Sequence, residues 1–223
     1  MEKKNSLLST FINPLFRENP ILVSLLGLCP VLVVTDTFDK SFGMGLAVTL
    51  VLFFTNLVIS LIRKIFPNEV RIPVFIVIIA TFVTVVEKLM EAFTPVLYGS
   101  LGVIISLITV NCIVLGRGEA FASKNKVVPS IIDALGQGLG FMIACVLIGI
   151  VREFLGKGGI TVSNPFTGEA IFSAYPLADY SISVFNSSVG AFVVLGIMIG
   201  VFAFISAKRE EKEALKAKAK ETK

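Results

Sequence analysis

The sequence contains no histidine among its 223 residues. Haem held through imidazole, His-type zinc sites, His triads and His proton relays all need an imidazole nitrogen at neutral pH. The absence of histidine therefore excludes these classes of site. Any metal or cofactor bound by this chain must therefore use other ligands.

Charge is also scarce, because only 16% of the residues are charged while 55% are hydrophobic, and the mean hydropathy is +0.88. This composition is too apolar for a soluble domain of ordinary kind. The sequence predicts a protein that crosses the membrane several times.

Cysteine is rare too, with three residues that all fall inside apolar stretches. Three cysteines cannot all pair with one another, so no disulfide framework is expected. The chain also lacks P-loop, GxSxG, HExxH, kinase and deaminase signatures. Its basic C-terminal end has no accompanying fold or aromatic platform, so we expect no nucleic-acid partner.

Six stretches have the low charge expected of transmembrane helices, each of which needs about 20 apolar residues. They are residues 19–35, 43–62, 72–86, 92–116, 134–151 and 180–207. The first is short and interrupted by Gly27 and Pro30, so we expect a broken or half-length helix there. In the fourth stretch, Pro95, Gly99 and Gly102 disfavour a helix at the start, so we predict that the helix that crosses the membrane spans only about residues 101–116.

Sixteen of the twenty basic residues fall on one side of this six-span arrangement. Such an excess marks the cytoplasmic side, so both termini are predicted to be cytoplasmic. The exceptions, on the opposite side, are Lys40, Lys88, Arg152 and Lys157.

The chain contains two pairs of weakly similar segments, which we call echoes. SLLGLCPVLV (24–33) resembles SLITVNCIVLG (106–116), and GMGLAV leading to LIRK (43–64) resembles GQGLGF leading to IVRE (136–153). Because each copy has three spans, the second must be inverted relative to the first. We therefore predict an all-α integral membrane protein of six transmembrane helices in two inverted three-helix repeats, the first helix of each repeat being short or broken.

The predicted domain organisation follows from these repeats. Residues 1–207 form a single transmembrane domain, with repeat one over about 19–91 and repeat two over about 96–207. Residues 208–223 form a charged cytoplasmic tail, since they mix helix formers with charges and have almost no apolar face.

Cys29 and Cys112 occupy corresponding positions in the two echoes. A free cysteine usually packs as a small hydrophobe, but Pro30 breaks the chain beside one and the polar Asn111 lies beside the other. Two thiolates near the bilayer centre suit iron, iron-sulfur or Cu(I). A 2Fe-2S cluster held by cysteine alone needs four thiolates, so a partner subunit would have to supply two.

Other polar and thiol groups have simpler interpretations. Cys145 has no counterpart in the first repeat and is interpreted as packing. For Asn56, a hydrogen bond between helices is favoured over a place on an ion path. Arg117 and Glu119 are expected to anchor a span end or to contact a neighbour.

Four segments resemble a known family: NPILVSLLGLCPVLVVT (19–35), RIPVFIVIIA (71–80), NCIVLGRGEAFASKN (111–125) and VREFLG (151–156). They are similar to the membrane subunits shared by Rnf complexes and sodium-translocating NADH:quinone reductases, and most similar to the E-type Rnf branch. The resemblance implies six spans in two inverted halves. It also implies that Cys29 and Cys112 join two cysteines of a homologous sister subunit around an intramembrane iron-sulfur centre, either 2Fe-2S or a single iron.

The resemblance further implies a function. Such a membrane protein carries electrons across the bilayer within an ion-translocating ferredoxin:NAD oxidoreductase of the bacterial plasma membrane and couples this flow to Na⁺ or H⁺ translocation. Its other partners are subunits with flavins and iron-sulfur clusters, and no complete active site lies in this chain alone. The alternatives are a secondary transporter with inverted repeats, the equivalent quinone reductase subunit, or a structural anchor for flavoproteins.

Overall fold

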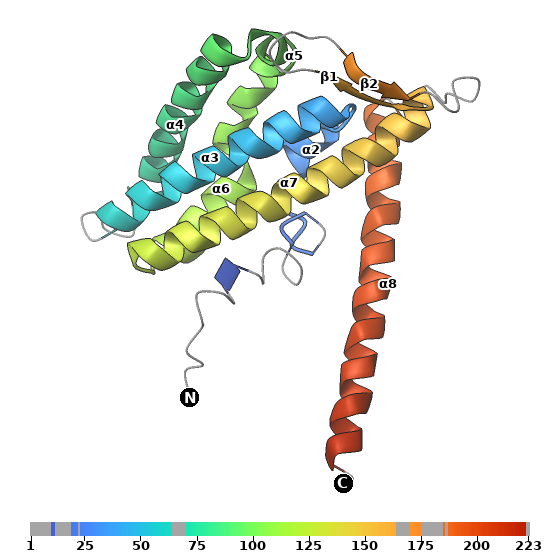
Figure 1. The fold of residues 1–223 in the computed structure, drawn as a ribbon. Helices are drawn as coiled ribbons and strands as arrows, with labels where there is room; N and C mark the ends of the chain where they lie inside the picture. The colour runs from blue at the N-terminus through green and yellow to red at the C-terminus, as the bar shows by residue number, and fades with distance from the viewer. Residues whose placement is uncertain are drawn as a thin grey trace.

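The computed structural model describes residues 10–11, 19–21, 23–63, 70–163, 170–174, 185 and 187–221, with the backbone alone at 160–163, 170–174 and 209–221. Figure 1 shows the arrangement of its helices and one small hairpin. The elements in chain order are α2 (Leu28–Val34), α3 (Phe38–Ile62), α4 (Arg71–Phe93), α5 (Pro95–Ile105), η2 (Ser106–Val110), α6 (Cys112–Arg117), η3 (Gly118–Ala122), α7 (Val127–Lys157), β1 (Ile160–Ser163), β2 (Ala170–Ala174) and α8 (Ser188–Glu221).

Helices α3 and α7 lie side by side and antiparallel, and form the centre of the molecule (Figure 1). Two glycines allow the close approach: a Cβ on Gly45 would lie 2.9 Å from the Cα of Met142, and one on Gly138 would lie 2.9 Å from the Cα of Thr49. Only a residue without a Cβ fits such a contact. The buried side chains of both helices therefore form one continuous core.

Five helical segments within the described residues are long and apolar enough to cross a membrane: Phe38–Ile62, Arg71–Phe93, Pro95–Ala122, Val127–Lys157 and Ser188–Lys208. This confirms a helical, multi-pass membrane fold. Six spans are not confirmed, because the helix described in the stretch predicted as the first span is α2, which has seven residues. That segment was expected to be broken or half-length, and Gly27 begins the short helix in a left-handed conformation.

The third candidate span, Pro95–Ala122, is interrupted at a different place from the one predicted. Helix α5 begins at Pro95, because proline is well accommodated at the first position of a helix. The interruption comes later, where the 3₁₀-helix η2 ends in the extended residue Asn111. The prediction of a membrane-crossing helix over residues 101–116 is therefore wrong, because this range contains the break at Asn111.

A two-stranded antiparallel hairpin, β1 paired with β2, follows α7. Ile160 pairs with Ala174 and Val162 with Phe172. No strand was among the elements expected from the sequence. The preceding helix α7 ends at Gly158, whose positive φ of 68° terminates the helix in the left-handed conformation.

Helix α8 contacts the rest of the molecule near its start, where Ala191, Val194 and Leu195 are buried. Beyond this part it extends away from the other helices (Figure 1). The helix continues through residue 208 to Glu221, so the predicted boundary at 208 separates apolar from charged sequence within one helix.

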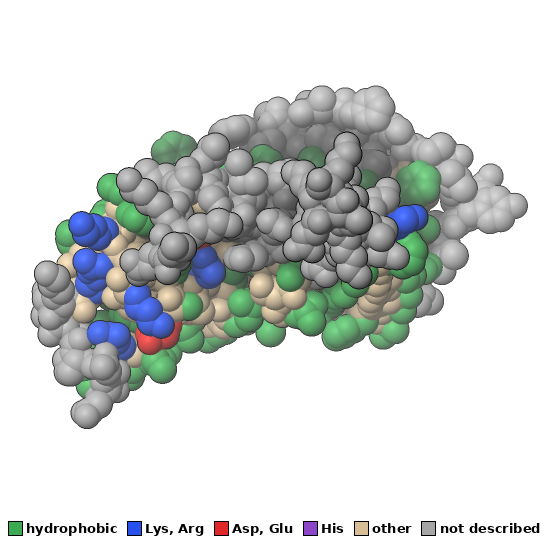
Figure 2. Space-filling model, turned by 90° about the horizontal axis from the view of Figure 1, so that it is seen from below, with side chains coloured by type: hydrophobic (Ala, Val, Ile, Leu, Met, Phe, Trp, Pro, Cys, Tyr) green, Lys and Arg blue, Asp and Glu red, His purple; other side chains and the backbone are tan. Residues whose placement is uncertain are grey.

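Basic residues near the end of α3 and the start of α7 gather at one end of the molecule. Arg63 Nη1 donates to the Lys124 carbonyl oxygen (3.2 Å) and Ser60 Oγ donates to the Asn125 carbonyl oxygen (3.0 Å). The end of α3 and the turn before α7 therefore lie together, as the shared side of their loops predicted. Figure 2 shows most of the Lys and Arg side chains visible from below at this end of the molecule.

Candidate functional site

Cys29 lies in the first turn of α2. Gly27 precedes this helix with φ 81° and ψ 19°, a left-handed conformation that glycine adopts without steric cost. The same position has little space, because a Cβ on Gly27 would lie 2.9 Å from Phe141 Cε2. The side chain of Cys29 is exposed.

Cys112 is the first residue of α6 and is also exposed. Asn111 precedes it in extended conformation, with φ −68° and ψ 119°, and breaks the third span. The Asn111 Oδ1 atom accepts a hydrogen bond from Ile113 N (3.2 Å), which caps the new helix. Asparagine thus both ends η2 and starts α6.

The turns before the two cysteines meet. Gly27 N donates to Cys112 Sγ at 2.9 Å, and a Cβ on Gly27 would lie 3.3 Å from Asn111 Oδ1. Residues 85 apart in sequence are therefore in direct contact, and the first turn of α2 lies beside that of α6. The structure brings together the two regions that the sequence had paired through their cysteines.

This junction lies near the middle of α7. Phe141 packs at Gly27, and the neighbouring Gly140 carbonyl oxygen accepts from Asn19 Nδ2 (3.1 Å). With a rise of about 1.5 Å per residue, Phe141 lies roughly 12 Å along α7 from Asp133 and roughly 16 Å from Arg152. Those two charged residues are thus separated by about the thickness of the hydrocarbon core.

The two short helices run from the junction toward opposite ends of α7. At the end of α6, Arg117 forms a two-point ion pair with Asp133, near the start of α7, with Arg117 Nε 3.0 Å from Asp133 Oδ2. At the end of α2, Arg152, near the end of α7, donates to Thr35 Oγ1 (2.7 Å). Arg117 was expected to anchor a span end or to contact a neighbour, and it contacts the neighbouring helix α7.

Cys145 and Asn56 lie elsewhere in the interior. Cys145 is 2% exposed and belongs to the hydrophobic core. Asn56 is fully buried, but neither its Oδ1 nor its Nδ2 atom has a hydrogen-bond partner among the residues that the structure describes. The interhelical hydrogen bond predicted for Asn56 is therefore wrong.

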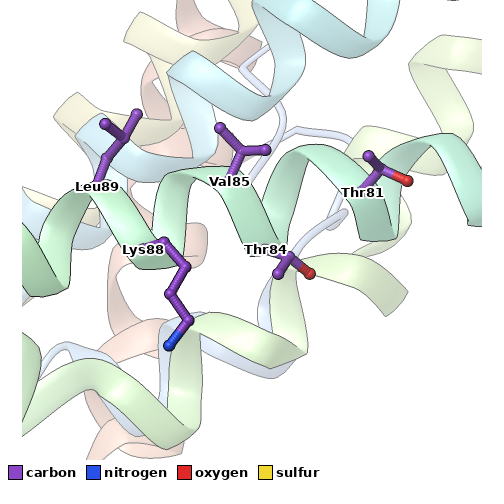
Figure 3. A pocket seen from close by; sticks show the side chains of 5 residues that line it. All are labelled: Thr81, Thr84, Val85, Lys88 and Leu89. Carbon is purple, nitrogen blue, oxygen red and sulfur yellow. The ribbon is translucent and has the colours of Figure 1, made fainter.

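A groove on the outer side of α4 is lined by Thr81, Thr84, Val85, Lys88 and Leu89 (Figure 3). Both threonine hydroxyls donate to carbonyl oxygens of their own helix, and Lys88 Nζ donates to Glu91 Oε2 (2.7 Å). The polar groups of this groove are already paired. The groove therefore does not offer the convergent polar groups that a solute site requires.

No three His, Cys, Asp or Glu side chains within the described ranges lie close enough to hold a metal ion together. The exposed pair Cys29 and Cys112 offers two soft thiol ligands and a backbone N–H directed at one sulfur. This donor set fits half of a site with four thiolate ligands. The sequence had indicated Gly27 as a helix break but not as a site residue; the signal that could have shown its role was a glycine two residues before a cysteine.

Comparison with known proteins gives a family model and named relatives that agree with one another. The family model described as "Rnf-Nqr subunit, membrane protein" matches residues 7–202. The chain is 44% identical to the E subunit of the ion-translocating oxidoreductase complex of Methanosarcina acetivorans, over 93% of each chain. It is 45% identical to the protein of the same name from Haemophilus influenzae strain Rd, over 86% of this chain and 83% of the relative.

A third relative carries a more specific name. The chain is 45% identical to the E subunit of the Na⁺-translocating ferredoxin:NAD⁺ oxidoreductase complex of Acetobacterium woodii, over 84% of this chain and 91% of the relative.

Proposed function

Because the chain belongs to the Rnf-Nqr family of membrane subunits, we propose that it is a membrane subunit of an ion-translocating ferredoxin:NAD oxidoreductase complex, with the other subunits of that complex as its partners. It takes part in electron and ion transport, as one part of a translocase whose complete active site is assembled from several chains. The names of the relatives favour this function over the secondary transporter, and the ferredoxin:NAD⁺ oxidoreductase named for one of them favours it over the quinone reductase.

Within that complex, Cys29 and Cys112 are proposed to be iron ligands. The observation that supports this most directly is the contact between Gly27 N and Cys112 Sγ, which places the two cysteine-bearing helix starts side by side. Both thiols are exposed, so a second protein can reach them. A cysteine needed only for packing would be expected inside the core, as Cys145 is.

The centre is proposed to be completed by two cysteines of a homologous sister subunit. The surface around the exposed thiols suits a protein contact in the membrane, because Val23, Leu25 and Val33 are each about half exposed beside Cys29. Either a 2Fe-2S cluster or a single iron with four thiolate ligands would supply one-electron chemistry there. The Gly27 N–H would stabilise negative charge on the Cys112 sulfur.

The depth of the junction supports a role in electron transfer. The Gly27 contact with Phe141 lies near the middle of α7, between charged residues that mark its two ends. A centre at that depth divides a crossing of about 30 Å into two shorter electron transfers.

Reciprocal contacts between α3 and α7 support the proposal of two inverted repeats. The sequence echo relates Gly45 to Gly138 and, in the same register, Thr49 to Met142. The Gly45–Met142 contact is therefore the image of the Gly138–Thr49 contact, and both place a Cβ 2.9 Å from the partner Cα. A pseudo-two-fold axis between α3 and α7 produces such pairs. The opposite directions of α2 and α6 agree with it.

The orientation follows from charge. The end of the molecule that holds Arg63, Lys124 and Lys126 is proposed to face the cytoplasm of a bacterial cell, together with both termini. The membrane is then the plasma membrane.

The test measures iron, acid-labile sulfide and the EPR spectrum of the reduced complex. The variants are Cys29→Ala and Cys112→Ala, with Cys145→Ala as the matched control in the same chain. We expect one iron signal to disappear in each of the first two variants and to persist in the control. An unchanged iron content and spectrum in the first two would reject the metal centre, although membership of the complex would stand.

A further inference from the structure

Arg152 is a charged residue with a position that the proposed electron transfer does not explain. It is 2% exposed, near the end of a membrane-spanning helix, and is among the largest fully buried side chains. A buried guanidinium is costly unless its donors are satisfied. Its partners therefore indicate what it holds in place.

Two of these partners belong to the end of α2. Arg152 Nη1 donates to Thr35 Oγ1 (2.7 Å) and to the Leu32 carbonyl oxygen (3.3 Å). A positive charge at the C-terminus of a helix interacts favourably with its unpaired carbonyl groups and dipole. Arg152 thus caps the C-terminal end of the helix that carries Cys29.

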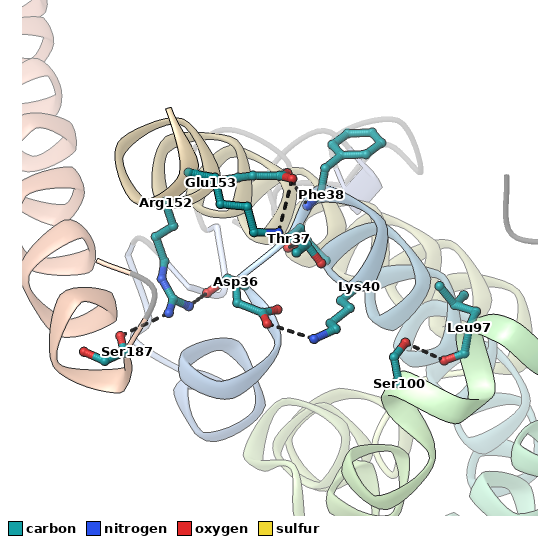
Figure 4. A network of polar contacts seen from close by, with 12 residues as sticks. Asp36, Thr37, Phe38, Lys40, Leu97, Ser100, Arg152, Glu153 and Ser187 are labelled. Carbon is teal, nitrogen blue, oxygen red and sulfur yellow. Dashed lines mark hydrogen bonds and ion pairs between the residues drawn. The ribbon is translucent and has the colours of Figure 1, made fainter. Parts of the chain in front are cut away.

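Two further partners lie just before α8. Arg152 Nε donates to the Phe185 carbonyl oxygen (3.3 Å), and Nη2 donates to the Ser187 carbonyl oxygen (3.2 Å). One planar guanidinium therefore joins α7, α2 and the start of α8 (Figure 4). Lysine cannot reproduce this, because its donors radiate from a single atom.

Helix α2 depends on such anchors because of its length. Seven residues are too few for a stable isolated helix, so contacts at its ends determine its position. The junction with Gly27 holds one end, and Arg152 holds the other. Cys29 lies six residues before Thr35, only about 9 Å along the helix axis, and moves with it.

We propose that Arg152 is the positioning residue for Cys29: it locks α2 against α7 and α8, and so sets the place of the Cys29 thiol relative to Cys112. The importance of this position for electron transfer rests on the proposed function, whereas the positioning of Cys29 by Arg152 does not. The end of α6 has a separate anchor, the ion pair of Arg117 with Asp133, which holds the helix of Cys112 to α7 without Arg152.

The first experiment places nitroxide spin labels on Cys29 and Cys112 of the full chain with Cys145→Ala, and measures their dipolar coupling by EPR. We expect Arg152→Gln to cause loss of the close, well-defined coupling, and Arg152→Lys to cause partial loss. Arg63→Gln is the matched control, because Arg63 directly follows α3 and donates to the Lys124 carbonyl oxygen rather than to α2. It should leave the coupling unchanged.

A second labelled pair distinguishes positioning from general loss of structure. It joins Cys112 to Val128→Cys, with Cys29→Ala and Cys145→Ala, and does not involve α2. We expect Arg152→Gln to leave this distance unchanged. A coupling between Cys29 and Cys112 that survives Arg152→Gln, or equal disturbance of both pairs in Arg152→Gln and Arg152→Lys, would overturn the proposal.

The complex provides a further readout. If the metal centre exists, Arg152→Gln should shift or abolish the EPR signal that Cys29→Ala abolishes, while Arg63→Gln should not. If Cys29→Ala leaves every signal intact but the spin-label coupling still depends on Arg152, the metal centre is rejected and the positioning role remains.

Discussion

At the residue scale, Gly27 combines two requirements that only glycine meets. Its φ of 81° is left-handed, and its Cα faces Phe141 with no space for a Cβ. The backbone N–H that contacts Cys112 belongs to the same residue. The close contact between the two cysteine regions therefore depends on the absence of a side chain.

Replacing Gly27 by alanine tests this dependence. The left-handed backbone alone costs a non-glycine residue about 1–2 kcal/mol, and the new methyl group overlaps Phe141. We expect Gly27→Ala to weaken or remove the signal of the membrane iron centre. Gly99→Ala is the control, since no described atom other than those of its chain neighbours and its own helix backbone lies within 4 Å of its Cβ position. Normal EPR spectra from both variants would contradict this account.

Asn56 offers a second residue-scale prediction. Its buried amide has no partner within the described part of the chain, so leucine at this position removes an uncompensated desolvation cost. We expect Asn56→Leu to keep or raise the temperature at which the detergent-solubilised chain loses its folded peak in size-exclusion chromatography.

Asn19→Leu is the matched comparison for Asn56→Leu. Asn19 is also buried, but it donates to Gly140 O and accepts from Ile21 N. Its replacement should destabilise the chain by about 1–3 kcal/mol, because two partners are left unpaired. A large loss of stability in Asn56→Leu would indicate that its amide is satisfied in the membrane by water or an ion.

At the scale of elements, the short helices arise from interruptions that differ in chemistry. Gly27 starts α2 through a left-handed turn, whereas Asn111 starts α6 through an extended residue with a side-chain cap. The first interruption was predictable from Gly27 and Pro30. The second was misplaced, because Pro95 was expected to disturb the helix that it begins.

The contact between α3 and α7 gives an element-scale prediction. A Cβ on Gly138 would lie 2.7 Å from the Thr49 side chain and 2.9 Å from its Cα, so Gly138→Ala should force the helices apart at a cost of about 1–3 kcal/mol. Gly196→Ala, with nothing within 4 Å, should be neutral or stabilising by up to about 1 kcal/mol. Thermal stability in detergent is the measurement, and equal midpoints for the two variants would refute the close packing.

At the scale of the whole molecule, large apolar surfaces remain uncovered. Helix α4 fully buries only the stripe of Phe75, Ile79, Val83 and Val86. Its exposed apolar side chains are Ile72, Ile76, Val77, Val85, Leu89 and Phe93. On α8, Val201, Phe204 and Ile205 are exposed. Such surfaces suit lipid or other membrane proteins. The fold is thus suited to a component of a membrane assembly.

Membrane orientation is the prediction that belongs to the whole molecule. Lys126→Cys and Lys157→Cys place single reporters at opposite ends of α7. A membrane-impermeant maleimide should label position 157 in intact cells, and position 126 only after the membrane is opened. The unmodified chain is the control for its native cysteines. Labelling of position 126 in intact cells would reverse the proposed orientation.

The sequence by itself determined the membrane class, the helical spans after the first and the grouping of the basic loops, and it led to the prediction that Cys29 and Cys112 act together. These features depend on composition, run length and internal similarity, which are properties of the chain in order. Only the tertiary structure decided that Gly27 contacts Cys112, that Arg117 pairs with Asp133 and that Arg152 holds α2. Those contacts join residues that packing of α3 against α7 brings together, and no local pattern encodes them.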